Sequence, residues 1–245
     1  CRKSVMSDTN TSRSVAFISA LILAAGLATG GGLIAGAIRD ARHFDQSVEV
    51  RGLAEQVVKS DQASWQLNFT TFGADALSAN RAWADKMTAL EQTLKAQGFK
   101  AENIRRLPLS LSDSFGNGGN LPPLNQRFRA NGGVVVETTD VDLVDRASRT
   151  TETFVSAGVV LDNSYVRYFF TDLNRIKPGM LKAATANARD AAATFAKDSG
   201  VVVGNIKSAN QGLFAISSPV SDYDAESSLM KKVRVVSRIQ FFIEP

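Results

Sequence analysis

Two hydrophobic patterns follow one another along this chain. The first is an uninterrupted uncharged run, Val15–Ile38, bounded by Arg13 and Arg39. At about 1.5 Å per residue, a helix of this length reaches roughly 36 Å, which is enough to cross a hydrocarbon layer about 30 Å thick. The run therefore predicts one N-terminal transmembrane helix that acts as a signal anchor, with the lipid bilayer as its partner.

The residues expected to form this anchor are apolar or small and are spread along the run: Val15, Phe17, Leu21, Leu23, Gly26, Gly30, Leu33 and Ile38. The four-residue glycine spacing would let two such helices approach closely, although membrane helices also tolerate glycine without that role. A cleaved signal peptide is the alternative, with a small-residue site near Ala37. Its apolar region normally covers only about 7 to 15 residues, so the length of the run favours an uncleaved anchor.

The second pattern begins at Val48, where apolar and polar residues alternate with period two. Such alternation is typical of a half-buried strand in an antiparallel sheet. The period then becomes helical between Asp75, an expected N-cap, and Gly98, an expected helix stop. Leu77, Met87, Leu90 and Leu94 are among the residues expected on the buried stripe of this helix. Further strands are expected over 62–72, 104–115, 127–138, 165–170, 203–210 and 230–243, and further helices over 140–157 and 174–199.

The order of these elements predicts an α+β fold, with antiparallel sheets and helices packed on one side. The strand over 165–170 carries aromatic residues on both faces, so we expect it to be covered on both sides. We expect the buried face of the alanine-rich helix over 174–199 to carry Leu181, Ala184, Ala188, Ala191 and Phe195. The segment over 112–126 is the longest predicted loop.

Composition excludes some classes of function. The 245 residues carry a net charge of +4, but 28 basic residues are scattered among 24 acidic ones. Nucleic-acid binding proteins typically show a basic block interleaved with aromatic residues, so we expect no nucleic-acid partner. Cys1 is the only cysteine, which rules out an internal disulfide and suits an oxidising compartment.

Candidate metal sites are incomplete. His43 is the only histidine, and without a second histidine it cannot anchor a zinc site, so we expect it to be solvated beside the anchor. Asp222, Asp224 and Glu226 imitate the start of a calcium loop, but the required glycine and the final glutamate are missing further on. An acidic loop in solvent is the better interpretation.

Other polar clusters also have structural interpretations. Asp140, Asp142 and Asp145 could serve acid–base chemistry or magnesium, but they stand at a predicted helix start, where carboxylates cap the helix. The glycine-rich segment over 116–120 lacks the Lys-Ser/Thr of a phosphate loop and is expected to be a turn. Lys231, Lys232, Arg234 and Arg238 indicate a wet strand face, or alternatively a patch for anionic headgroups. We therefore expect no catalytic residues, cofactor or metal.

Four segments together resemble the SIMPL-domain family. Val48–Trp65 carries Gly52, Asp61 and Ala63 where that family has a glycine and an Asp-x-Ala that enters the second strand. The other matching segments are Gly98–Ile104, Arg127–Asp142 and Gly200–Gly204. The order and spacing of these segments extend the resemblance over nearly all of 48–242.

The resemblance implies an exported bacterial envelope protein with two small intertwined subdomains and no established enzymatic activity. The outer subdomain, which would pair the first two strands with the last strands, would take 48–97 and 173–245, and the inner one 98–172. They follow a leader over 1–14, the anchor and a linker over 39–47. Members of the family more often have a short cleavable signal.

We therefore expect a SIMPL-like protein anchored in the inner membrane by a single span, with its C-terminal domain in the periplasm. It is expected to be non-enzymatic and to form a homo-oligomer, and the resemblance suggests a contribution to envelope or oxidative-stress tolerance. Two alternatives stay open. One is a soluble binding module released after cleavage near Ala37, and the other is a hydrolase that uses Asp61, Asp140 or Asp142. The sequence identifies no small-molecule ligand.

Overall fold

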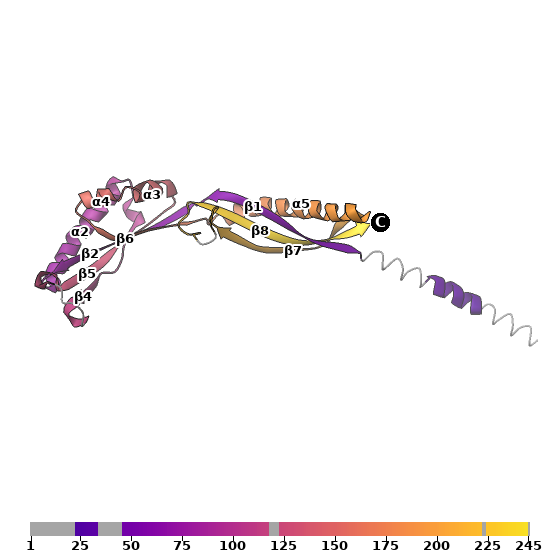
Figure 1. Ribbon diagram of the computed structural model, residues 1–245, viewed down its shortest axis with the longest axis horizontal. Coiled ribbons are helices and arrows are strands. Elements are labelled where there is room, and N and C mark those ends of the chain that lie inside the picture. Colours follow the sequence, from indigo (N-terminus) through magenta and orange to yellow (C-terminus); the bar gives the residue numbers. More distant parts are fainter. Residues whose placement is uncertain (1–22, 34–45, 118–122, 222–223, 245) are drawn as a thin grey trace, which may run out of the picture. The chain divides into compact units, whose positions relative to one another are not determined.

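The computed structural model describes residues 23–33, 46–117, 123–221 and 224–244 (Figure 1). These residues divide between two compact units. One unit takes 1–52, 187–210 and 238–245, and the other takes 53–186 and 211–237. The boundary between the two units passes through three long strands and one long helix. Each of these four elements therefore contributes one segment to each unit.

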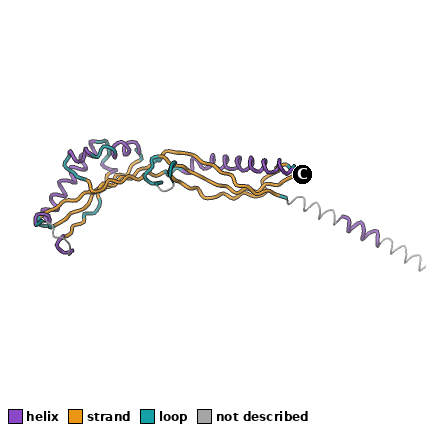
Figure 2. Tube along the Cα trace, in the orientation of Figure 1, coloured by secondary structure: helices purple, strands orange, loops and turns teal. Residues whose placement is uncertain are grey.

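The fold is α+β, as the sequence predicts, and its strands form two sheets (Figure 2). The three-stranded sheet has the order β1-β8-β7. Its strands are β1 (Ser47–Lys59), β7 (Val202–Ser217) and β8 (Met230–Glu244). The helix α5 (Leu173–Ser199) supplies apolar residues to the clusters on this sheet in each unit.

The five-stranded sheet has the order β3-β5-β2-β6, with β4 paired to β5. Its strands are β2 (Gln62–Gly73), β3 (Ile104–Arg106), β4 (Ser110–Asp113), β5 (Phe128–Thr138) and β6 (Leu161–Phe169). Its helices are α2 (Ala76–Ala96), α3 (Val141–Ser148) and α4 (Glu152–Ser156). Single turns of 3-10 helix lie at Ala101–Asn103, Ser114–Asn117 and Leu124–Gln126.

A single buried cluster joins α2, α3 and α4 to one face of the five-stranded sheet (Figure 1). Trp65 lies at its centre and is fully buried, with ring centroids 5.9 Å from Phe99 and 5.8 Å from Phe154. Trp65, Leu67 and Phe69 alternate along β2 and all face these helices, as their period of two requires. The opposite face of the same sheet carries the intervening polar residues.

The membership of β2 differs from what the family resemblance implied. β1 pairs with the closing strand β8, but β2 pairs with β5 and β6 in the other sheet. The expectation that the first two strands both join the last strands is therefore wrong. The physical reason is that the apolar face of β2 is matched to α2, which follows directly, rather than to α5. The predicted subdomain boundaries themselves stay a prediction.

Two predicted elements are each divided in the structure. The strand over 104–115 is interrupted at Pro108, which has no N–H to donate, and becomes β3 and β4. The helix over 140–157 stops after Ser148 and restarts at Glu152. Thr150 causes this break because its hydroxyl and its backbone N–H both donate to the carbonyl of Ala147, each at 3.1 Å.

Three expectations about burial are wrong. β6 is an edge strand, so Tyr165 and Phe169 are partly exposed and the strand is not covered on both sides. Phe195 is 61% exposed, because the buried stripe of α5 follows Ala184, Ala188, Ala192 and Ala196 at intervals of four residues. Leu77 is 58% exposed, and Ala79 and Trp83 take its place on the buried face of α2.

The predicted anchor lies partly within the described residues. A helix covers 23–33, where Leu23 and Leu33 are 69% and 77% exposed and both Gly26 and Gly30 have open space beside them. Val15, Phe17, Leu21 and Ile38 lie outside the described residues. Within the described ranges, no helix combines the length and the apolar character that crossing a membrane requires. The anchor therefore stays a prediction.

Tyr168 leads to a prediction about alkaline pH. It is only 5% exposed, and its burial, together with the negative charge of Asp145, raises the pKa of its phenol from 10.0 to about 12. The folded state thus holds this proton more tightly than the unfolded chain does. The stability that follows is fully present below about pH 10 and is lost as pH rises towards 12.

We expect this loss to amount to about 2 to 3 kcal/mol over that range. Guanidinium unfolding at a series of alkaline pH values measures it. The variant Tyr168→Phe should show a correspondingly flatter dependence, whereas an equally steep decrease in that variant would assign the effect to other groups.

Candidate binding site at the end of the five-stranded sheet

Local sequence brings two connections together where β5 ends. Gly98 terminates α2 with a φ of +104°, a conformation that favours glycine, and the chain then turns Phe99 into the core. Beyond β5, Asp140 begins α3 as its N-cap: its carboxylate accepts from the N–H of Leu143 at 3.0 Å. Its own N–H donates to the Thr138 hydroxyl at 3.0 Å.

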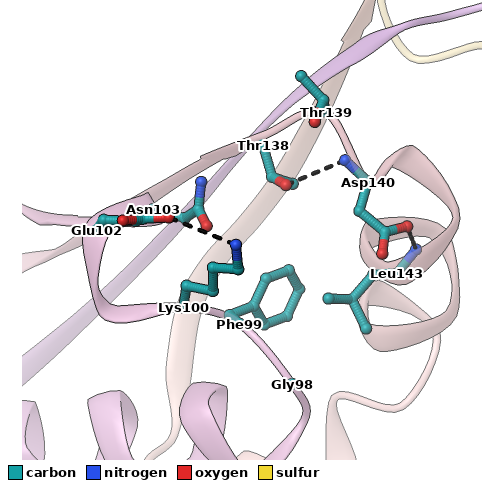
Figure 3. Close-up of a pocket in the computed structure, with 9 residues that line it drawn as sticks. All are labelled: Gly98, Phe99, Lys100, Glu102, Asn103, Thr138, Thr139, Asp140 and Leu143. Atoms are coloured by element: carbon teal, nitrogen blue, oxygen red, sulfur yellow. Dashed lines mark hydrogen bonds and ion pairs between the residues drawn. The ribbon is translucent and has the colours of Figure 1, made fainter.

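Asn103 ties the connection after α2 to the end of the sheet. Its side-chain amide donates to the carbonyl of Glu137 at 2.7 Å. The space left between these segments is a hollow of about 330 Å³ on the helix side (Figure 3). It is lined by Gly98, Phe99, Lys100, Glu102, Asn103, Thr138, Thr139, Asp140 and Leu143.

A second hollow, of about 440 Å³, shares Asn103, Thr138 and Thr139 with the first. Gln62 and Ser64 of β2 line it together with Glu137 and Phe169, their register partners on β5 and β6. These side chains belong to the face of the sheet opposite the helices, because Ala63 and Trp65 point into the core. The second hollow therefore opens on the polar face.

The groups around the two hollows are suited to hydrogen bonding. Amide and hydroxyl side chains dominate the lining of the second hollow, whereas the first also contains Lys100, Glu102 and Asp140. Two exposed ion pairs lie here, with 3.7 Å between Lys100 and Glu102 and 3.7 Å between Arg105 and Glu137, and such pairs are weak. In the part of the chain that the structure describes, no group of three or more acidic, histidine or cysteine residues could hold a metal ion. The arrangement can bind a polar, uncharged ligand.

The carboxylates named by the hydrolase hypothesis all have structural partners. Asp140 caps α3, which confirms the capping interpretation, and Asp145 pairs with Arg149 at 3.0 Å on the same helix. Asp142 accepts both of its contacts, at 2.5 and 2.6 Å, from the ammonium of Lys59. Asp61 lies before α5, where its carboxylate accepts from the backbone N–H groups of residues 171 and 172. Each of these carboxylates is thus engaged by a backbone N–H group or by a basic side chain.

Asp61 provides a test of this structural role. Its oxygens accept three contacts from Thr171 and one from Asp172, at 2.9 to 3.1 Å. We expect Asp61→Ala to lower the free energy of unfolding by about 1 to 2 kcal/mol, as the loss of a helix cap does. Thermal unfolding followed by circular dichroism measures this. Asp61→Asn is the matched control, because its side-chain oxygen still accepts, and a loss as large as that of the alanine variant would contradict the capping role.

The predicted basic strand does not form one solvent-facing patch. Lys231 points inward and is 2% exposed, and its ammonium donates to the backbone carbonyls of Ala225 and Glu226. Burial lowers the pKa of this lysine. Arg234 lies on the other face and pairs with Glu55 at 3.5 Å. In the other unit, Arg238 pairs with Glu49 at 3.3 Å.

The remaining candidates lie wholly or partly outside the described residues. His43 and Asp222 are outside them, as are residues 118–120 of the glycine-rich segment. Glu226, at the end of the segment that resembles a calcium loop, accepts a hydrogen bond on its backbone carbonyl from the N–H of Tyr168 at 2.7 Å.

Sequence reasoning missed three residues that line the hollows, Asn103, Thr138 and Thr139, because no motif marks them. The alternation of polar residues along β2 was the one sequence pattern that pointed to a polar surface at this end of the sheet.

Comparison with known proteins gives one extensive match. The model of a family described as SIMPL, protein of unknown function (DUF541), matches residues 48–238. No curated protein matches the chain. A solved structure of an uncharacterized conserved protein from Listeria innocua is 9% identical, with a TM-score of 0.21 and coverage of 78% of this chain and 92% of that one. A hydrolase from Listeria innocua is 8% identical, with a TM-score of 0.18 and coverage of 78% and 91%. Both TM-scores are too low to carry an argument about fold or activity.

Proposed function

Since this chain belongs to the SIMPL family, whose function is unknown, we propose that it is a non-enzymatic binding protein of the bacterial cell envelope. The observation that supports binding rather than catalysis is the use of the acidic side chains. Asp61 and Asp140 hold helix starts and Asp142 holds Lys59, whereas the hollow of about 440 Å³ is lined largely by amides and hydroxyls. Acid–base hydrolysis needs carboxylates that are free to exchange protons with a substrate.

The apolar run Val15–Ile38 is proposed to tether this protein to the inner membrane, with the domain after residue 48 in the periplasm. Its length supports a span, and the exposed leucines of the helix over 23–33 are suited to lipid contact. Protease treatment of spheroplasts, combined with carbonate extraction, tests this topology. We expect the domain to be digested from outside and the intact protein to stay in the membrane pellet.

Release of the intact chain by carbonate would contradict tethering, and so would a mature N-terminus near Ile38. That N-terminus would instead support the soluble module produced by cleavage near Ala37. Protection from protease in spheroplasts would contradict the periplasmic orientation. The SIMPL resemblance also suggests a contribution to envelope or oxidative-stress tolerance, which survival of a deletion strain under peroxide measures.

Self-association is the second part of the proposal, and the edge strand β7 supports it. Apolar residues along this strand are exposed to solvent: Val202, Ile206, Leu213 and Ile216. An unpaired edge with exposed apolar residues is a template for pairing with another chain. Light scattering of the full chain in detergent should give a mass of at least two copies, and Leu213→Lys should lower it. A monomer at all concentrations would contradict self-association.

A further inference from the structure

The face of the five-stranded sheet opposite α2, α3 and α4, called here the open face, is unusually rich in uncharged polar side chains. Along β2 these are Gln62, Ser64, Gln66, Asn68 and Thr70. Their register places Asn163 of β6 beside Asn68, and Asn131 of β5 beside Thr70. The described helices contribute to the cluster on the other side of the sheet. A row of amides and hydroxyls thus lies along β2 on this face, exposed at Gln62 and half-buried at the other four positions.

Part of this array is held in place by its own hydrogen bonds. The Thr70 hydroxyl donates to Asp162 at 2.5 Å and accepts from the Asn131 amide at 2.9 Å. Asn131 also approaches Asp162 at 3.4 Å. Side chains fixed before binding lose less conformational entropy when a ligand arrives, so this arrangement favours affinity.

Gly133 lets β5 approach β2 closely beneath the array. It is itself buried and lies opposite Asn68, and a Cβ atom built on it would come within 1.9 Å of the Leu67 carbonyl and 2.8 Å of the Asn68 side chain. A glycine inside a strand often marks a position where another backbone approaches closely, and here that backbone is β2.

Aromatic rings border the array along the edge strand β6. Tyr165 and Phe169 lie on the open face and are 46% and 37% exposed. Phe169 also lines the hollow of about 440 Å³. Exposed rings on a flat polar surface can stack against the C–H face of a sugar ring, while amides and hydroxyls exchange hydrogen bonds with its hydroxyls.

The charges on the open face exclude a strongly charged ligand. Arg105 is matched by Glu137 at 3.7 Å, and Asp162 lies in the same array as Arg129 and Arg167. A nucleic acid would call for an excess of positive charge and a series of stacked aromatics. A protein partner would call for an exposed apolar centre, whereas here the register partner of Gln66 on β5, Val135, is buried and the side chains beside it are mainly amides and hydroxyls. The mixed signs and neutral centre fit an uncharged polymer rich in hydroxyl groups.

We propose that the open face binds an extended, uncharged glycan, with Tyr165 stacking on a sugar ring and Gln66 and Asn68 hydrogen bonding to its hydroxyl or acetamido groups. This proposal rests on the binding role proposed above and gives it a ligand class. Its failure leaves the topology experiments unaffected, so the two proposals are tested separately.

Isothermal titration calorimetry of the full chain is the direct test. The detergent must have no sugar headgroup, because a maltoside would compete for the same face. Chitohexaose and cellohexaose are the two probes: both are uncharged β-1,4 hexamers, and only the first carries acetamido groups. We expect saturable binding of at least one, and their affinity ratio tells whether acetamido groups contribute. No saturable binding of either would overturn the proposal.

Variants then locate the site. We expect Tyr165→Ala to weaken binding at least about fivefold, since it removes one stacked ring, and Tyr165→Phe to retain most of the affinity. Gln66→Ala should weaken binding through the loss of hydrogen bonds. Phe195→Ala is the matched control, because it removes from α5 an aromatic ring that is also exposed, at 61% compared with 46% for Tyr165.

Circular dichroism verifies that each variant is folded. Equal affinities of Tyr165→Ala, Gln66→Ala and the original chain would place binding elsewhere and overturn the proposal. A loss in Phe195→Ala as large as in Tyr165→Ala would do the same. Binding of single-stranded DNA in preference to both glycans would assign the face to the other class of polymer.

Discussion

Replacing Gly133 by alanine is expected to lower the free energy of unfolding by about 3 kcal/mol, which is towards the upper end for overpacking in a well-packed structure. The added Cβ would meet the backbone carbonyl of Leu67 at 1.9 Å and the Cα of Asn68 at 2.9 Å. Backbone atoms of a central strand cannot move aside as a flexible side chain can. The pairing between β2 and β5 must therefore separate locally.

Guanidinium unfolding followed by tryptophan fluorescence measures this loss. Gly179→Ala is the control: Gly179 is in α5 with no atom within 4 Å of its added Cβ. In a helix, that substitution should raise the free energy of unfolding by about 0.5 to 1 kcal/mol. A loss below about 1 kcal/mol for Gly133→Ala would show that the two strands are not as close as described.

Replacing Trp65 by alanine is the second change with a large expected effect, about 3 to 5 kcal/mol. Trp65 is fully buried and lies against both Phe99 and Phe154, and its indole N–H donates to the hydroxyl of Ser164 at 2.9 Å. Its removal leaves a large cavity between β2 and the helices. Because the substitution deletes one of the two tryptophans, circular dichroism is the suitable probe.

Phe195→Ala is the matched control for this substitution as well. The sequence pattern predicted that Phe195 is buried, but its ring is 61% exposed, so its removal should change the free energy of unfolding by no more than about 0.5 kcal/mol. A cost comparable to that of Trp65→Ala would restore the original assignment of the α5 face. It would also contradict the alanine stripe described for this helix.

The elements of the fold were predictable where one periodicity continues without interruption. The alternation along β2 identified Trp65, Leu67 and Phe69 as core residues, and the structure confirms all three. The pattern could not show which sheet β2 joins, because period two fixes the face of a strand and leaves its neighbours open. For α5, alanines and larger residues compete for the same stripe, and close packing selected Ala192 and Ala196 rather than Phe195.

The candidate site was less predictable, for a different physical reason. The role of Asp140 could be derived from local sequence, because capping depends on a residue and the N–H groups that follow it. The hollow on the open face instead combines Gln62, Asn103 and Phe169, which come from separate elements. Residues of this kind carry no motif.

The central claim is that this chain acts by binding through the open face and uses its carboxylates for structure. The most direct test compares chitohexaose and cellohexaose affinities of two folded full-chain variants, Asp61→Asn/Asp142→Asn and Tyr165→Ala. We expect the carboxamide variant, which retains both side-chain shapes, to bind as the original chain does and Tyr165→Ala to bind at least about fivefold more weakly. Loss of binding in the carboxamide variant together with full affinity in Tyr165→Ala would contradict the claim.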